Sequence, residues 1–401
     1  MKPIYYIIPL INFFVAALFG LLLRSMFVYP IEGVTFLYIL HTHSHIALLG
    51  WLYLLVYVLF VQKFAVDSIK ETKFYTRLFW VTQLSVMGMA LTFPFMGYAA
   101  PSIAFSTLHI ICSYVFVIHL WKHNNIIGTQ HGVLLKTSLF FMAFSTLGVW
   151  CLGPAVGMMG KASAFYQICI QFFLHFQFDG WFLTAFLALL FATVFKGYSL
   201  AKFTPFYYAW ITSVLLTYAL PLSWYIEFPI LHYLNFLGVL LQFYAVGYLI
   251  KPVYSVFKQE SNCKGKRSVC LLAILALFCF IMRIGTQLLT VSETITIQLQ
   301  TLRSWIIGFI HLNMLGVLTA FGLWLMIREQ KLIVNTWTKS GIGILILGFV
   351  LTEGILLLQG LQGFMSVNWI SNTPMLLFWT SVLLPMSILC FLLSYLKNKR
   401  L

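Results

Sequence analysis

The sequence contains few charged residues, and this shortage restricts the classes of protein to which it can belong. Only 8% of its 401 residues are charged, whereas about a quarter of the residues in a soluble domain are charged. No polar stretch is long enough to form a soluble domain, and the longest, residues 251–268, has the length of a loop. The composition therefore excludes a folded ATPase or nucleotide-binding module within this chain.

Paired cysteines and a continuous basic face are also missing. The seven cysteines are scattered and form no C-x-x-C pair, so neither a disulfide scaffold nor a thiol zinc site is indicated. The formal net charge is +15, but the cations lie in short segments between apolar runs and form no continuous surface. We therefore expect no nucleic-acid partner.

Long apolar runs dominate the sequence instead. Hydrophobic residues make up 61% of the chain and recur in runs of about 20 residues, the length that crosses the core of a bilayer. Because every backbone amide in hydrocarbon must be paired within its own segment, these runs predict helices. We predict an all-α, multi-pass protein of the cell membrane, in contact with lipid, whose residues 1–401 form one domain of 12 transmembrane helices. The predicted spans are 4–24, 36–61, 77–98, 101–121, 137–159, 164–195, 205–225, 228–250, 269–290, 303–327, 340–360 and 374–396.

The basic residues alternate between the two sides of these predicted spans. Twenty of the 24 lysines and arginines fall near the chain ends or in alternate loops. Cytoplasmic loops carry an excess of such residues, so the pattern predicts that both the N-terminus and the C-terminus are cytoplasmic.

None of the odd-numbered predicted spans contains a histidine. His45, His175 and His311 lie in the outer halves of the second, sixth and tenth spans, and each begins the pattern H-x4-G, which ends at Gly50, Gly180 and Gly316. The three motifs recur at intervals of about four helices, which predicts three pseudo-repeated four-helix arcs. A glycine at this position lets a flat group or another helix approach closely. Neutral imidazole is a common ligand of transition metals, so histidines at one depth favour a shared ligand.

This arrangement resembles subunit I of the heme-copper oxidase superfamily, which has 12 helices in three arcs. The segment from His43 through His45 to Leu-Leu-Gly-Trp also resembles the second helix of C-family oxidase-like and NnrS-like heme-copper membrane proteins. The resemblance implies a b-type heme with axial ligands His45 and His311, and a copper ligand at His175. His43 or His41 could replace His45 if the register differs. The motifs of the oxygen-reducing centre are degenerate, because the seventh span has no histidine and the tenth reads His311-Leu-Asn313.

Four other charged residues lie in or at the ends of the predicted spans. Asp179 follows His175 by four residues, so it could orient that histidine, ligate a metal such as copper with it, or relay protons. Arg303 opens the tenth span and could bind heme propionates or anchor the helix at the interface. Arg283 and Glu353 lie at similar predicted depth, which favours an ion pair between them.

The sequence leaves several functions open. The resemblance favours a heme protein in electron transfer or in nitric oxide or metal handling, with other respiratory-chain subunits or an electron donor as partners. An oxidoreductase of the heme-copper oxidase type is included in that class. A secondary transporter that uses intramembrane Asp, Glu and His is the main alternative, although transporter halves usually repeat at six helices rather than four. A non-catalytic assembly protein is the third possibility.

Overall fold

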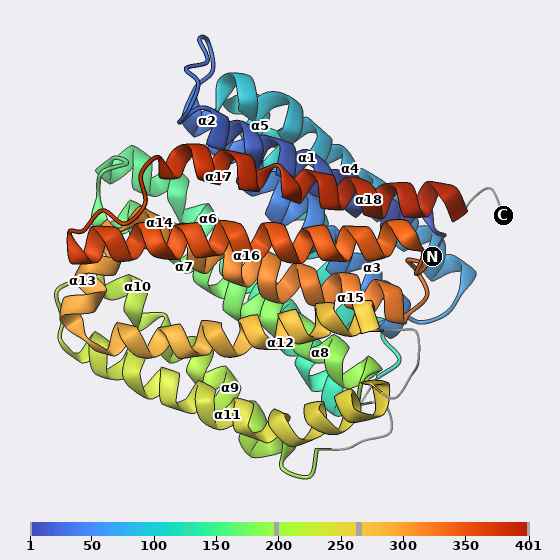
Figure 1. Ribbon diagram of the computed structural model, residues 1–401. Coiled ribbons are helices and arrows are strands. Elements are labelled where there is room, and N and C mark those ends of the chain that lie inside the picture. The colour runs from blue at the N-terminus through green and yellow to red at the C-terminus, as the bar shows by residue number, and fades with distance from the viewer. Residues whose placement is uncertain (1, 127, 196–199, 262–266, 399–401) are drawn as a thin grey trace. The chain divides into compact units, whose positions relative to one another are not determined.

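The computed structural model describes residues 2–126, 128–195, 200–261 and 267–398, and the regular elements that it assigns in these ranges are all helices (Figure 1). The helices group into two compact units. Unit 1 comprises residues 1–120, 266–277 and 307–401, and unit 2 comprises residues 121–265 and 278–306. The predicted all-α class is therefore confirmed.

Unit 1 contains the first four predicted spans and the last three. Its elements are α1 (Ile4–Ser25), α2 (Phe36–His45), η1 (Ile46–Tyr53), α3 (Leu54–Phe64), α4 (Ile69–Met96), α5 (Ala100–Lys122), η4 (Leu312–Thr319), α15 (Ala320–Arg328), α16 (Thr336–Met365), α17 (Thr373–Ser381) and α18 (Leu383–Asn398). The helix α14 (Arg303–His311) begins in unit 2 and ends in unit 1. α1 packs against α2, η1 and α18, while α16 runs beside α17 and α18 (Figure 1).

Unit 2 contains the middle of the chain. Its elements are α6 (Gln130–Met159), α7 (Ala164–His175), η2 (Phe176–Leu183), α8 (Thr184–Thr193), α9 (Phe203–Thr217), α10 (Ala219–Ser223), α11 (Ile230–Ser261), η3 (Leu288–Val291) and α13 (Glu293–Thr301). The helix α12 (Arg267–Gln287) begins in unit 1 and ends in unit 2. Within unit 2, α6 packs along α7, η2 and α8, and α11 packs along α9. The loop expected at residue 251 begins later, because α11 continues to Ser261.

Within the described ranges, eleven helices are long and apolar enough to cross a membrane. The predicted span 205–225 is not among them, because its helix is interrupted at Tyr218 between α9 and α10. Pro221 explains the interruption, since proline has no N–H to donate to the Thr217 carbonyl and its ring crowds that carbonyl. The multi-pass architecture is therefore supported, while the count of twelve stays a prediction.

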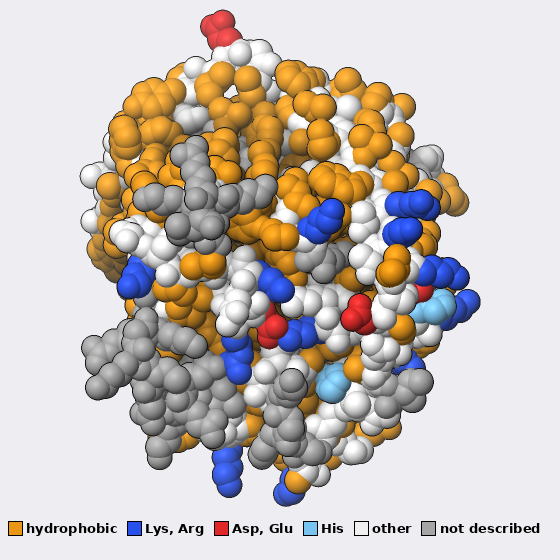
Figure 2. All heavy atoms as spheres, turned by 90° about the vertical axis from the view of Figure 1, so that its right-hand side faces the viewer, with side chains coloured by type: hydrophobic (Ala, Val, Ile, Leu, Met, Phe, Trp, Pro, Cys, Tyr) orange, Lys and Arg blue, Asp and Glu red, His pale blue; other side chains and the backbone are white. Residues whose placement is uncertain are grey.

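Both chain ends lie at the same end of unit 1 (Figure 1). Lys331, in the loop between α15 and α16, lies 5.7 Å from the ring of Tyr6 in the first turn of α1. Ser394, near the end of α18, hydrogen-bonds Thr338 in the first turn of α16 at 2.7 Å. Lys63 pairs with Glu329 at 2.7 Å at this end of unit 1. Lys and Arg side chains are visible on the face of the molecule that Figure 2 presents. The start of α1, the end of α18 and the loop between α15 and α16 therefore lie at one end of unit 1, and the cytoplasmic location of the termini stays a prediction.

A buried amide pair joins α1, η1 and α4 in the core of unit 1. The Asn12 amide donates to the Gly50 carbonyl at 2.9 Å and to the Gln83 side chain at 2.8 Å, and Gln83 donates back to Asn12 at 3.1 Å. A Cβ on Gly50 would lie 2.9 Å from Val86 Cγ1 and 3.1 Å from Asn12 Cβ. The glycine of the first H-x4-G motif therefore admits neighbouring helices.

This pair leads to a testable expectation. Asn12→Leu should destabilise the protein by about 1–3 kcal/mol, because it leaves the Gly50 carbonyl and the Gln83 amide buried without a partner. The double variant Asn12→Leu/Gln83→Leu should lose less than the sum of the two single variants. Thermal unfolding in detergent measures these effects, with the exposed Thr380→Ala as the control. Additive losses would show that the two amides are not coupled.

Candidate functional site

The three H-x4-G motifs share one unusual backbone conformation. A π-helix of eight residues begins directly after each histidine: η1 follows His45, η2 follows His175 and η4 follows His311. The motif glycine is the fifth residue of each π-helix. Such helices are rare, usually span a single turn and often occur at functional sites. The same conformation at all three motifs indicates that they are equivalent structural elements.

The histidines of α2 point to two different surroundings, as their spacing predicts. His41 and His45 both contact the ring of Tyr98, with ring centroids 4.5 Å and 5.8 Å away, and His45 also packs on Phe93 at 4.5 Å. The Nδ1 atom of His45 donates to the His41 carbonyl at 2.8 Å, and its Nε2 lies 3.4 Å from the Tyr98 hydroxyl. His45 therefore sits in an aromatic group formed by α2, the end of α4 and the following loop.

His43 faces α1 instead. Its Nδ1 donates to the Ala16 carbonyl at 2.8 Å. A Cβ on Gly20 would lie only 2.9 Å from Cε1 of the His43 ring, so this glycine makes room for the imidazole. A carbonyl oxygen can only accept, so Nδ1 carries the proton and Nε2 keeps its lone pair.

His311 has an ionisable neighbour in unit 1. The Nδ1 atom of His311 lies 3.4 Å from Oε1 of Glu353 on α16. The structure therefore places a carboxylate beside His311 and a backbone carbonyl beside His43.

The fourth predicted cofactor-binding residue, Arg303, is the first residue of α14, and its side chain is exposed. Arg24 is a better candidate for an anionic group near His43. Sequence reasoning missed it, although the spacing Gly20-x3-Arg24 places both residues on one face of a helix.

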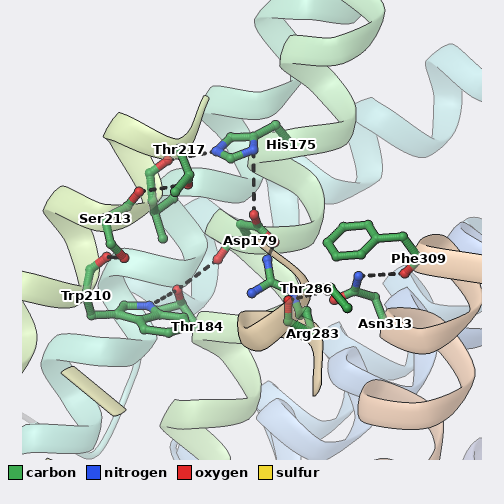
Figure 3. Close-up of polar contacts among 11 residues, drawn as sticks. His175, Asp179, Thr184, Trp210, Ser213, Thr217, Arg283, Thr286, Phe309 and Asn313 are labelled. Carbon is green, nitrogen blue, oxygen red and sulfur yellow. Dashed lines mark hydrogen bonds and ion pairs between the residues drawn. The ribbon is translucent and has the colours of Figure 1, made fainter. Parts of the chain in front are cut away.

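The predicted copper residues of unit 2 form a different kind of cluster (Figure 3). Oδ1 of Asp179 is paired with the guanidinium of Arg283, which is fully buried. Oδ2 of Asp179 lies 3.6 Å from Nδ1 of His175, and Nε2 of His175 donates to the Val214 carbonyl at 2.7 Å. The expected pair between Arg283 and Glu353 is therefore wrong, because Asp179 is the partner of Arg283 and Glu353 adjoins His311.

This donor set does not suit a cation such as copper. Arg283 already neutralises the Asp179 carboxylate, and the Nε2 proton of His175 is held by a backbone carbonyl. Among the residues that the structure describes, no group of three or more His, Cys, Asp or Glu side chains could hold a metal ion. A heme has a different requirement, since two axial imidazoles suffice.

Gly180, the motif glycine of unit 2, allows a neighbouring helix to pack closely, as Gly50 does in unit 1. A Cβ on Gly180 would lie 2.7 Å from the Phe141 ring of α6, so α6 packs directly on η2. Of the two occupants that the sequence allowed at these glycines, a flat group or another helix, the structure places helices at Gly50 and Gly180.

The chain was compared with known protein families and with curated proteins, and it matches neither a family model nor an individual protein. The assignment of function therefore depends on the geometry of these side chains.

The ion pair of unit 2 can be tested by charge removal. Asp179→Leu and Arg283→Leu should each destabilise the protein by about 3–5 kcal/mol, because each leaves the other charge buried and unpaired. The double variant should recover most of this loss. Thermal unfolding in detergent measures the effect, and a double variant as unstable as the sum of the singles would contradict the pairing.

Proposed function

We propose that this multi-pass membrane protein binds one b-type heme in unit 1, which His43 and His311 would hold, and serves in electron transfer. The observation that supports the proposal is the position of one ring nitrogen in each histidine. The Nδ1 atom of His43 donates to the Ala16 carbonyl, and the Nδ1 atom of His311 lies 3.4 Å from a carboxylate oxygen of Glu353.

The donor chemistry fits this group. A metal-ligating histidine usually donates its second ring N–H to a carbonyl or carboxylate, which fixes the tautomer and the orientation of the ring. His43 meets this condition through the Ala16 carbonyl, and His311 lies beside Glu353. In each residue Nε2 is then the nitrogen available to a metal. When bound, the heme iron would supply one-electron redox chemistry.

A cation on α1 would suit an anionic ligand. Gly20 packs against the His43 imidazole, and Arg24 lies one turn farther along α1. A guanidinium can bind a propionate through two parallel hydrogen bonds. Arg24 would hold this anionic edge in the role that the sequence offered to Arg303.

Electron transfer is favoured over oxygen reduction because the predicted copper ligands do not form a complete metal site. The segment of the predicted seventh span contains no histidine. Asp179 is engaged by Arg283, so His175 and Asp179 do not offer a free donor set to copper. An electron donor or other respiratory-chain subunits would be the partners of such a protein.

The axial ligands can be identified by optical spectroscopy of the purified, detergent-solubilised protein. His43→Ala and His311→Ala should each abolish the reduced-minus-oxidised signal of a low-spin b-type heme, because each removes one axial ligand. His45→Ala should retain it, since His45 is held in the aromatic group with Phe93 and Tyr98. His232→Ala is the control. If His45→Ala loses the heme signal and His43→Ala retains it, the ligands are instead His45 and His311, the pair predicted from the sequence.

A second variant tests the position of the His43 ring. Gly20→Ala should weaken heme binding, because the added methyl group would lie 2.9 Å from the imidazole. Gly343→Ala on α16 is a matched control, since its Cβ would meet nothing within 4 Å. Heme content per chain measures both. Equal heme content in the two variants would show that heme binding does not depend on the position that Gly20 gives to the His43 ring.

A further inference from the structure

Glu353 is a carboxylate in the middle of a predicted transmembrane helix, α16, where an ionisable side chain is costly. Its Oε1 atom lies 3.4 Å from Nδ1 of His311, and the two side chains are 17% and 24% exposed. Among the residues that the structure describes, no lysine or arginine forms an ion pair with Glu353. The contact with His311 is therefore the interaction that accounts for a carboxylate at this position.

α14 packs closely against α16 beside this carboxylate. Gly308 precedes His311 by three residues, so the two positions share one face of the helix. A Cβ on Gly308 would lie 3.4 Å from Oε2 of Glu353 and 3.8 Å from Cβ of Leu356, which are ordinary van der Waals contacts. The face of α14 that carries His311 therefore adjoins the Glu353 carboxylate.

The two proposed axial ligands differ in what holds them. His43 donates to a neutral backbone carbonyl at 2.8 Å, whereas His311 faces a carboxylate. A charged acceptor forms a stronger hydrogen bond than a neutral one, and it increases the basicity of the imidazole. The separation of 3.4 Å exceeds the usual N–H···O range of about 2.7–3.2 Å, so in this structure the two groups form an electrostatic contact and no hydrogen bond.

We propose that Glu353 is a positioning residue for His311, which orients its ring and strengthens its donation to the iron. This inference rests on the proposed heme function. A stronger donor stabilises ferric over ferrous iron, so Glu353 would lower the midpoint potential of the heme.

The test is a redox titration of the purified holoprotein and of Glu353→Gln, which keeps the shape of the side chain but removes its charge. Glu353→Gln should retain a bis-histidine spectrum while its midpoint potential rises. Loss of a carboxylate beside a ligand typically weakens metal binding about 10-fold to 100-fold. If only the affinity for the ferric heme falls, a tenfold fall raises the midpoint potential by about 59 mV for a one-electron couple.

Two further variants keep the result interpretable. Glu353→Asp retains the charge and should shift the potential less than Glu353→Gln does. Thr352 lies next to Glu353, and its hydroxyl donates to carbonyls of α16. The midpoint potential of the heme in Thr352→Val should therefore match that of the unaltered protein. If Glu353→Gln loses its heme, recovery of heme in Glu353→Asp supports the proposal, and loss in both variants overturns it.

The outcomes separate this inference from the proposed function. A heme signal with an unchanged potential in Glu353→Gln overturns the role of Glu353 and leaves the heme site intact. A folded, unaltered protein that contains no heme overturns the proposed function together with the inference.

Discussion

The cost of an unpaired polar group in hydrocarbon is the constraint on which the rest of this structure depends. Two buried polar clusters of the described residues are paired between helices. Asn12 and Gln83 satisfy each other and the Gly50 carbonyl, and Asp179 neutralises Arg283. The same constraint explains why the histidines are informative, since a ring with one nitrogen held by an acceptor presents the other to a ligand.

Much of the fold could be predicted from the sequence, because the length of an apolar run is set by the bilayer and needs no knowledge of tertiary contacts. Eleven of the predicted spans correspond to long apolar helices in the described residues. The segment 205–225 is the exception, and its Pro221 marks the interruption. The repeated H-x4-G pattern also located three equivalent backbone elements, although nothing in the pattern predicted that they are π-helices.

The candidate site was only partly predictable, because pairing between helices depends on rotation about each helix axis. Similar depth suggested that Arg283 pairs with Glu353, but depth carries no information about direction, and Arg283 faces Asp179. The same limit applies to α2, where His43 and His45 lie two residues apart and point to different neighbours. The spacing of two residues places the two side chains on different faces of the helix, but it does not identify the neighbours that each face contacts.

The central claim is that the chain itself carries a heme, and heme quantification tests it most directly. The measurement is the amount of b-type heme per mole of purified protein after expression in cells that are not limited for heme. The account predicts one heme per chain. A well-folded, monodisperse protein that contains none, and takes up none when heme is added, would contradict it.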